Sequence, residues 1–210
     1  MVIAIDGPAG TGKSTVASLI AKKLNVTFLN SGSFYRGLTL ALLEAKVDLS
    51  DSAKVIEFCK KQQLDYVNSH LILNGTDVES RLHEDQVSAN ASPVSAIPEV
   101  RHIVNDRLHE IVKSLSIVCE GRDMTTVVFP DAEYKFYLDA SIDVQAQRRF
   151  DQGVSNLSLE EIKEAIIKRD ALDKSKAEGA LKIAPDATYI DTSDLTIEKV
   201  CEIIISKIHQ

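Results

Sequence analysis

Residues 7–14 read GPAGTGKS, and they lie between the apolar stretch VIAI at 2–5 and a segment with helical periodicity. The pattern GxxxxGK[ST] requires this strand-to-helix context, in which glycines let successive backbone N–H groups curve around phosphate. In such a loop the lysine neutralises the β- and γ-phosphates and the hydroxyl ligates Mg²⁺. The sequence therefore predicts an ATP site with Lys13 as a catalytic residue, Ser14 as the metal ligand, and ATP-binding residues Gly7, Pro8, Ala9, Gly10, Thr11, Gly12, Lys13, Ser14 and Thr15.

Short apolar stretches alternate with amphipathic segments along the rest of the chain. The short stretches are almost continuously apolar, which is typical of strands buried on both faces, and they lie at 2–5, 28–29, 117–119, 136–138 and 189–190. Apolar residues spaced i, i+3/i+4 and i+7 predict helices on a core at 16–24, 34–45 and 197–208. The predicted fold is an α/β P-loop NTPase core, with a parallel sheet flanked by helices.

Composition limits the class of protein. The 210 residues are 44% hydrophobic and 26% charged, which is enough for one compact unit with a real core. A net charge of −7 argues against a general nucleic-acid or anionic-membrane binder, and no apolar run approaches the ~18 residues of a membrane span. Three cysteines without a CxxC pair fit a reducing compartment. We expect a cytoplasmic protein that binds neither nucleic acid nor membrane.

A second set of phosphate-binding residue types lies outside the loop at 7–14. NSGSFYR at 30–36 leads a Ser/Gly turn into a helix, where free N–H groups and the fork of Arg36 both suit an anion. EGRD at 120–123 also follows a predicted strand, and ligands of open parallel sheets lie beyond the carboxyl ends of the strands. Arg36 and Arg122 thus predict a second phosphate, that of an acceptor. Arg101, Arg148, Arg149 and Arg169 are further candidates, whereas Arg81 and Arg107 are equally well read as surface residues.

Two stretches interrupt the alternation. Residues 63–80 show period-two apolarity around a turn and then Asn74-Gly75, which predicts a small antiparallel insert. Residues 151–182 are highly charged, with helical periodicity at about 158–175 and few apolar anchors after it. We expect this second stretch to cover the surface and to move.

Over essentially its whole length the chain resembles bacterial-type cytidylate kinases, which are nucleoside monophosphate kinases. The resemblance lies in segments of matching order and approximate spacing: GPAGTGKST, NSGSFYR, NASPVSAIPEVR, EGRDMTTVVFPDA, KFYLDAS, KRDALDKS and IDTSDLTIEKV. It implies one kinase unit, with a core at 1–32, 103–150 and 183–210, a small antiparallel acceptor-binding insertion at about 33–102, and a helical lid at about 151–182. It also suggests a monomer.

The resemblance implies roles for individual residues as well. The acceptor phosphate is expected to contact Ser31, Tyr35, Arg36 and Arg122; the cytosine to contact Ser92, Arg101 and Asp123; and the ribose and phosphates to contact Arg169 and Asp173. Positive charge for catalysis is expected from Lys13, Arg122, Arg149 and Arg169. The chain departs from the usual pattern at Asn30, where such kinases have Asp, and in a lid with Leu172, Lys174 and Lys176 in place of more arginine.

The expected reaction transfers the γ-phosphoryl group of ATP to CMP or dCMP, in pyrimidine metabolism. Such in-line transfer needs alignment, Mg²⁺ and positive charge on the transferring oxygens, so we name no general base. Asp6 and Glu120 either contact the metal through water or have a structural role. Two alternatives stay open: a kinase for another small acceptor (UMP, dTMP or a non-nucleotide), and a nucleotide-binding regulator without turnover.

Overall fold

The computed structural model describes residues 1–113, 115–153 and 157–208. Residues 114 and 209–210 of the predicted core and 154–156 of the predicted lid lie outside the described residues. The chain forms two compact units, one of Met1–Phe28 with Ser116–Gln210 and the other of Leu29–Leu115. Within the described ranges, no helix is both long and apolar enough to cross a bilayer.

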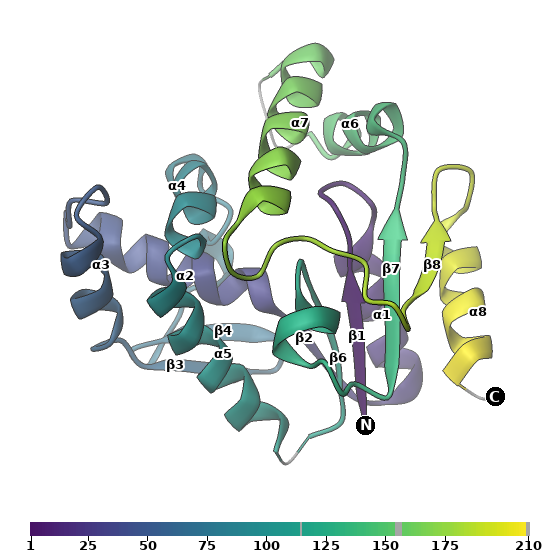
Figure 1. The fold of residues 1–210 in the computed structure, drawn as a ribbon, viewed down its shortest axis with the longest axis horizontal. Coiled ribbons are helices and arrows are strands. Elements are labelled where there is room, and N and C mark those ends of the chain that lie inside the picture. Colours follow the sequence, from purple (N-terminus) through teal and green to yellow (C-terminus); the bar gives the residue numbers. More distant parts are fainter. Residues whose placement is uncertain (114, 154–156, 209–210) are drawn as a thin grey trace. The chain divides into compact units, whose positions relative to one another are not determined.

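The first unit is organised around a five-stranded sheet of order β2-β6-β1-β7-β8 (Figure 1). β1 pairs in parallel with β6 and β7, and β7 pairs in parallel with β8. All five predicted strands are confirmed; their bounds are Val2–Asp6 (β1), Thr27–Asn30 (β2), Ile117–Gly121 (β6), Tyr134–Asp139 (β7) and Thr188–Asp191 (β8). The chain passes into the second unit within β2.

The α-helices described in this unit are α1 (Lys13–Leu24), α6 (Ile142–Asp151), α7 (Leu159–Ser175) and α8 (Ile197–Ile208), and Met124–Val128 forms a π-helical turn after β6. The apolar faces of α1 and α8 form one core with the strands, in which Ile5, Ile20, Phe136 and Ile204 are almost wholly buried. A smaller cluster of Ala146, Ile162 and Ile166 joins α6 to α7, which lie beside each other beyond the end of β7 (Figure 1).

Helix α7 begins at a capping box, in which the Ser158 hydroxyl accepts from the Glu161 backbone N–H and the Glu161 carboxylate accepts from the Ser158 N–H. Such a reciprocal pair satisfies two N–H groups that a helix N-terminus otherwise leaves open. The helix predicted at about 158–175 is therefore confirmed, and its first residue is fixed by local sequence.

The second unit contains helices and a separate three-stranded antiparallel sheet of order β3-β4-β5. Its elements are α2 (Ser31–Glu44), α3 (Ser52–Cys59), β3 (Leu64–Val67), β4 (His70–Leu73), β5 (Thr76–Asp77), a 3₁₀ turn (Glu79–Arg81), α4 (Asp85–Ser95) and α5 (Pro98–Val112). Asn74 and Gly75 connect β4 to β5 with φ of 50° and 80°, as a tight hairpin requires, so the antiparallel insert is confirmed. The unit extends beyond 102 because α5 is one continuous helix.

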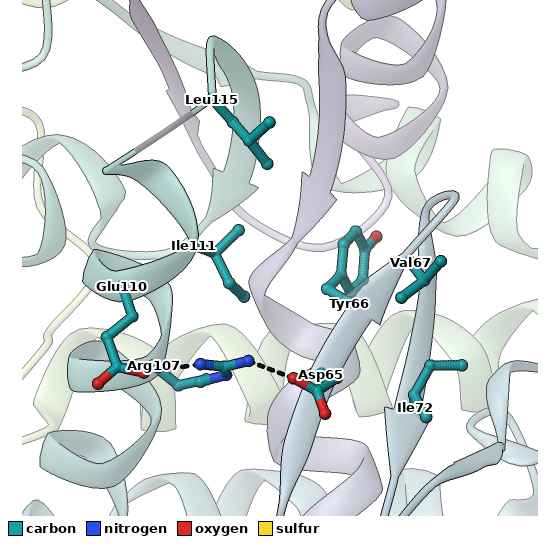
Figure 2. Close-up of a pocket in the computed structure, with 8 residues that line it drawn as sticks. All are labelled: Asp65, Tyr66, Val67, Ile72, Arg107, Glu110, Ile111 and Leu115. Carbon is teal, nitrogen blue, oxygen red and sulfur yellow. Dashed lines mark hydrogen bonds and ion pairs between the residues drawn. The ribbon is translucent and has the colours of Figure 1, made fainter.

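A surface pocket of the second unit contains Arg107 (Figure 2). This arginine forms ion pairs with Asp65 and Glu110 and donates to the Leu64 carbonyl. Arg81 likewise pairs with Glu44 and Glu84. Both arginines are bound to carboxylates at the protein surface, in agreement with the surface interpretation of these two side chains.

Candidate functional site

The loop at 7–14 packs tightly against β7 within the first unit. Gly7 has a φ of 149°, and a Cβ built there would lie 2.0 Å from the Leu138 carbonyl oxygen, so only glycine fits. Gly12 precedes α1 with a φ of 87°. The loop therefore delivers its backbone to the N-terminus of α1, where free N–H groups favour anions.

Lys13 is buried within this loop, with 5% of its surface exposed. Its Nζ donates to the Pro8 carbonyl at 2.5 Å and lies 3.4 Å from the Thr11 hydroxyl. Burial lowers the pKa of Lys13 to about 7, and the neighbouring Arg122 guanidinium contributes to the decrease. A lysine held this way, with little hydration, is a strong partner for a phosphate anion.

Ser14 and Glu120 offer oxygen ligands at the same end of the sheet. The Ser14 hydroxyl donates to Glu120 Oε1 at 2.8 Å, and Glu120 is 6% exposed. Mg²⁺ takes oxygen ligands, usually one or two from protein together with substrate phosphates and water. This donor set fits Mg²⁺ bound with a nucleotide, whereas the described residues contain no cluster of three or more His, Cys, Asp or Glu for a metal held by protein alone.

Arg122 follows β6 and is partly buried beside α7. Its Nε donates to Asp173 Oδ2 at 2.8 Å, with 17% of the Arg122 side chain and 4% of the Asp173 side chain exposed. Burial alone would lower the pKa of Arg122, but the Asp173 and Glu120 carboxylates outweigh it and the pKa lies above its ordinary value. Asp123, the next residue, is 2% exposed.

Helix α7 and Lys176, the residue that follows it, contribute charged groups near the phosphate loop and Arg122. Asp170 accepts from the Ala9 backbone N–H at 3.2 Å, and Lys176 pairs with Asp173 at 2.8 Å. Burial and the nearby Arg122 hold the pKa of Arg169 below its ordinary value. Arg149 on α6 donates to Gln152 at 2.9 Å and also acts electrostatically on Arg169. The first unit thus places Lys13, Arg122 and Arg169 within mutual electrostatic range.

The predicted acceptor residues of the second unit lie on α2, α4 and α5. Arg101 is 3% exposed, lies over the Tyr35 ring at 5.5 Å and donates to the Ser95 carbonyl at 3.2 Å. Arg36 donates to the Ser88 hydroxyl at 2.9 Å and to the Leu82 carbonyl at 3.2 Å. This unit therefore brings Tyr35 together with Arg101, and Arg36 with α4.

The remaining predicted residues of this unit flank those pairs. Ser31 begins α2 and is 3% exposed. Asn30 caps the helix, because its side-chain oxygen accepts from the Gly32 N–H at 2.9 Å. An aspartate would cap equally well, so this departure from the usual pattern keeps the local structure. Ser92 lies on α4 and is partly exposed, one turn before the Ser95 that binds Arg101.

Several contacts of this site were not predicted from sequence, among them one of Asp170 and one of Thr125. Asp170 contacts the loop at Ala9, and Thr125 donates to Asp6 through both its backbone N–H and its hydroxyl. Each joins residues more than a hundred positions apart, and no local spacing signals such a contact. The sequence offers only an indirect signal for these contacts. Asp170 follows the predicted site residue Arg169, and Thr125 lies two residues after the EGRD stretch.

Comparison with known proteins identifies the family of this chain. The family model for cytidylate kinase matches residues 3–210. The cytidylate kinase of Borrelia turicatae is 41% identical over 98% of this chain and 95% of its own length, and that of Clostridioides difficile is 37% identical over 100% and 98%. The structure of shikimate kinase from Bacteroides thetaiotaomicron is similar with a TM-score of 0.51 over 100% of this chain and 99% of that one, at 13% identity, which shows likeness of fold alone. Because the matches span nearly every residue, the chain belongs to the cytidylate kinase family.

Proposed function

We propose that the protein transfers the γ-phosphoryl group of ATP to CMP or dCMP, giving ADP with CDP or dCDP. One observation supports this proposal above the others. The partly buried Arg122 lies within electrostatic range of Lys13 in the phosphate loop, and the chain belongs to the cytidylate kinase family. The loop at 7–14 is sufficient to bind the phosphates of one nucleotide, ATP. We therefore assign Arg122 to the phosphate group of the acceptor.

The chain's own residues supply alignment and charge. Lys13 binds the β- and γ-phosphates, and Arg122, Arg149 and Arg169 stabilise the charge that develops on the transferring oxygens. Ser14 and Glu120 would hold Mg²⁺, and the bound ion would screen phosphate charge and orient the phosphates. Covalent catalysis is not needed, because positioning and electrostatics account for most of the acceleration in phosphoryl transfer.

We assign individual residues to the parts of the acceptor nucleotide. Ser31, Tyr35, Arg36 and Arg122 bind the phosphate of CMP, and Ser92, Arg101 and Asp123 contact the cytosine. Asp173 and Arg169 contact the ribose and phosphates. In this assignment Asp173 gives up part of its pairing with Arg122 and Lys176 to contact the nucleotide, while α7 moves as part of the lid.

We place this activity in pyrimidine nucleotide metabolism of the cytoplasm, as a monomer that binds neither nucleic acid nor membrane. Cys59, Cys119 and Cys201 are buried free thiols, which fits a reducing compartment. The net charge of −7 disfavours binding to polyanions.

A panel of acceptors tests the proposal directly. Purified protein with ATP and Mg²⁺ is assayed for ADP release with CMP, dCMP, UMP, dTMP, AMP and no acceptor. We expect CMP and dCMP to give much the highest kcat/KM. A preference for UMP, dTMP or a non-nucleotide acceptor would replace the assigned substrate, and ATP binding without acceptor-dependent turnover would indicate a regulator.

The lid gives a second prediction. Helix α7 buries only Ile162, Ile166, Asp170 and Asp173, and Ile167 and Leu172 are 51% and 49% exposed. Closure over bound nucleotides excludes water from the transferring phosphoryl group. We expect hydrogen exchange in peptides from 157–180 to slow markedly when a bisubstrate analogue binds, while peptides from α8 are unchanged. Equal protection of 157–180 with and without the analogue would contradict closure.

A further inference from the structure

Asp6 is the last residue of β1, and its side chain is completely buried. Oδ1 accepts from the Met124 backbone N–H at 2.9 Å. Oδ2 accepts from the Thr125 backbone N–H at 2.7 Å and from the Thr125 hydroxyl at 2.6 Å. Both carboxylate oxygens are therefore engaged by two consecutive residues of one turn.

That turn immediately follows Arg122 and Asp123. Residues Met124–Val128 form a single turn of π-helix, in which the Asp123 carbonyl accepts from the Val127 and Val128 N–H groups at 2.9 and 3.1 Å. The first N–H groups of a helical turn have no partner within it, and here Asp6 accepts from two of them. Isolated π-turns are rare and occur often at functional sites.

The charge on Asp6 suits this contact. Burial raises the pKa of Asp6 to about 6, while the hydrogen bonds from Thr125 and Met124 limit the increase. The carboxylate is thus ionised at neutral pH, and a carboxylate accepts from three donors where an amide side chain accepts on one atom only. A buried anion is retained only where such donors compensate for its lost hydration.

We propose that Asp6 is a positioning residue for the acceptor nucleotide, because its carboxylate fixes the backbone that presents Arg122 and Asp123. This inference rests on the proposed function of those two side chains. It replaces a role for Asp6 at the metal, since its oxygens are directed to Met124 and Thr125, whereas the Ser14 hydroxyl is bound by Glu120.

The phosphate loop has supports that do not depend on the Asp6 carboxylate. Its Thr11 hydroxyl donates to the Pro8 carbonyl, Gly7 packs on the Leu138 carbonyl, and β1 is paired on both sides through its backbone. Loss of the carboxylate should therefore affect the acceptor more than ATP.

Two threonines side by side provide a matched pair of variants. Thr125→Val removes a hydroxyl that donates to Asp6. Thr126→Val removes a neighbouring hydroxyl whose oxygen is buried and has no hydrogen-bond partner within the described ranges. Asp6→Asn keeps size and one acceptor, and Thr125→Ser keeps the hydroxyl, so these variants separate hydrogen bonding from packing.

The experiment measures KM for CMP, KM for ATP, the Mg²⁺ dependence and the melting temperature of each full-length variant, with wild-type turnover of CMP established first. We expect Asp6→Asn to raise KM for CMP on the order of tenfold, since hydrogen bonds to a charged group are lost, with KM for ATP changed less than twofold. Thr125→Val should act in the same direction more weakly, the double variant should be no worse than Asp6→Asn, and Thr125→Ser and Thr126→Val should resemble wild type.

Three results would overturn the inference. An increase in the Mg²⁺ requirement or in KM for ATP, with KM for CMP unchanged, would return Asp6 to the metal site. Equal changes for CMP and ATP, together with a lower melting temperature, would make it structural only. If Asp6→Asn does not fold, an unchanged KM for CMP in Thr125→Val decides against the role. A wild-type protein that does not phosphorylate CMP would instead reject the proposed function, which separates the two failures.

Discussion

Replacing Lys13 by alanine should lower kcat on the order of 10³-fold, because one positioned charge on the transferring phosphoryl group typically contributes about that much to catalysis. The charge is needed most in the transition state, when the bond to the leaving oxygen breaks. We therefore expect kcat to fall more than the affinity for ATP.

The same substitution should leave the fold intact. Lys13 is buried, and burial lowers its pKa to about 7, so its charge is not a source of stability in the protein without nucleotide. We expect a melting temperature equal to or above that of wild type. Lys13→Met, which keeps the length of the aliphatic chain, separates lost charge from lost packing.

Lys22→Ala is the matched control, since Lys22 lies on the same helix and is exposed. It should have wild-type kcat. A kcat near wild type in Lys13→Ala would refute the assignment of the phosphate loop as the catalytic ATP site.

The elements that sequence predicts well are those with local physical causes. The strand and helix around 7–14 follow from apolar periodicity and glycine placement, the hairpin from Asn74-Gly75, and the start of α7 from Ser158 and Glu161. In each case the residues that determine the structure are within a few positions of one another. Apolar periodicity and the preferences of turn and cap residues are therefore sufficient to predict these elements.

The contacts that assemble the site have no such local cause. Asp6 with Thr125, Ser14 with Glu120, and Ala9 with Asp170 join segments that the parallel sheet topology brings to one end. Sequence placed Ser14 and Arg122 beyond strand ends, but left open whether Asp6 and Glu120 serve a metal or the structure. The choice is made by which donors each carboxylate meets, and that depends on the tertiary fold.

The sequence also could not predict the partners and burial of each arginine. Arg36, Arg107 and Arg122 are alike in type, yet Arg107 pairs with surface carboxylates, whereas Arg122 is partly buried beside Asp173. Position after a strand distinguished Arg122 in advance. Helical position alone did not reveal that Arg36 bonds to Ser88.

Replacing Asp123 by asparagine should narrow the preference for CMP over UMP. Cytosine presents a donor at its 4-amino group and acceptors at N3 and O2, whereas uracil presents an acceptor at O4 and a donor at N3. A carboxylate only accepts and a guanidinium only donates. If Asp123 accepts from the amino group and Arg101 donates to N3 or O2, as we propose, this pairing matches cytosine and opposes uracil.

The size of the effect follows from burial. Asp123 is 2% exposed and Arg101 is 3% exposed, and a mispaired buried polar group costs about 1–3 kcal/mol, more when charged. Sites that pair every polar group of the base discriminate by about 10⁴. Because an asparagine amide also donates, Asp123→Asn should lower kcat/KM for CMP by roughly 10- to 100-fold and lower that for UMP much less.

The competing explanation is that Asp123 only supports Arg122. Asp173 forms an ion pair with Arg122 at 2.8 Å, and we predict that Asp123 contacts the base. Asp131→Asn, an exposed aspartate in the same connection between β6 and β7, serves as the control and should leave both acceptors unaffected. If Asp123→Asn instead lowers kcat/KM for CMP and UMP by the same factor, Asp123 acts through Arg122, and the base is distinguished by other residues.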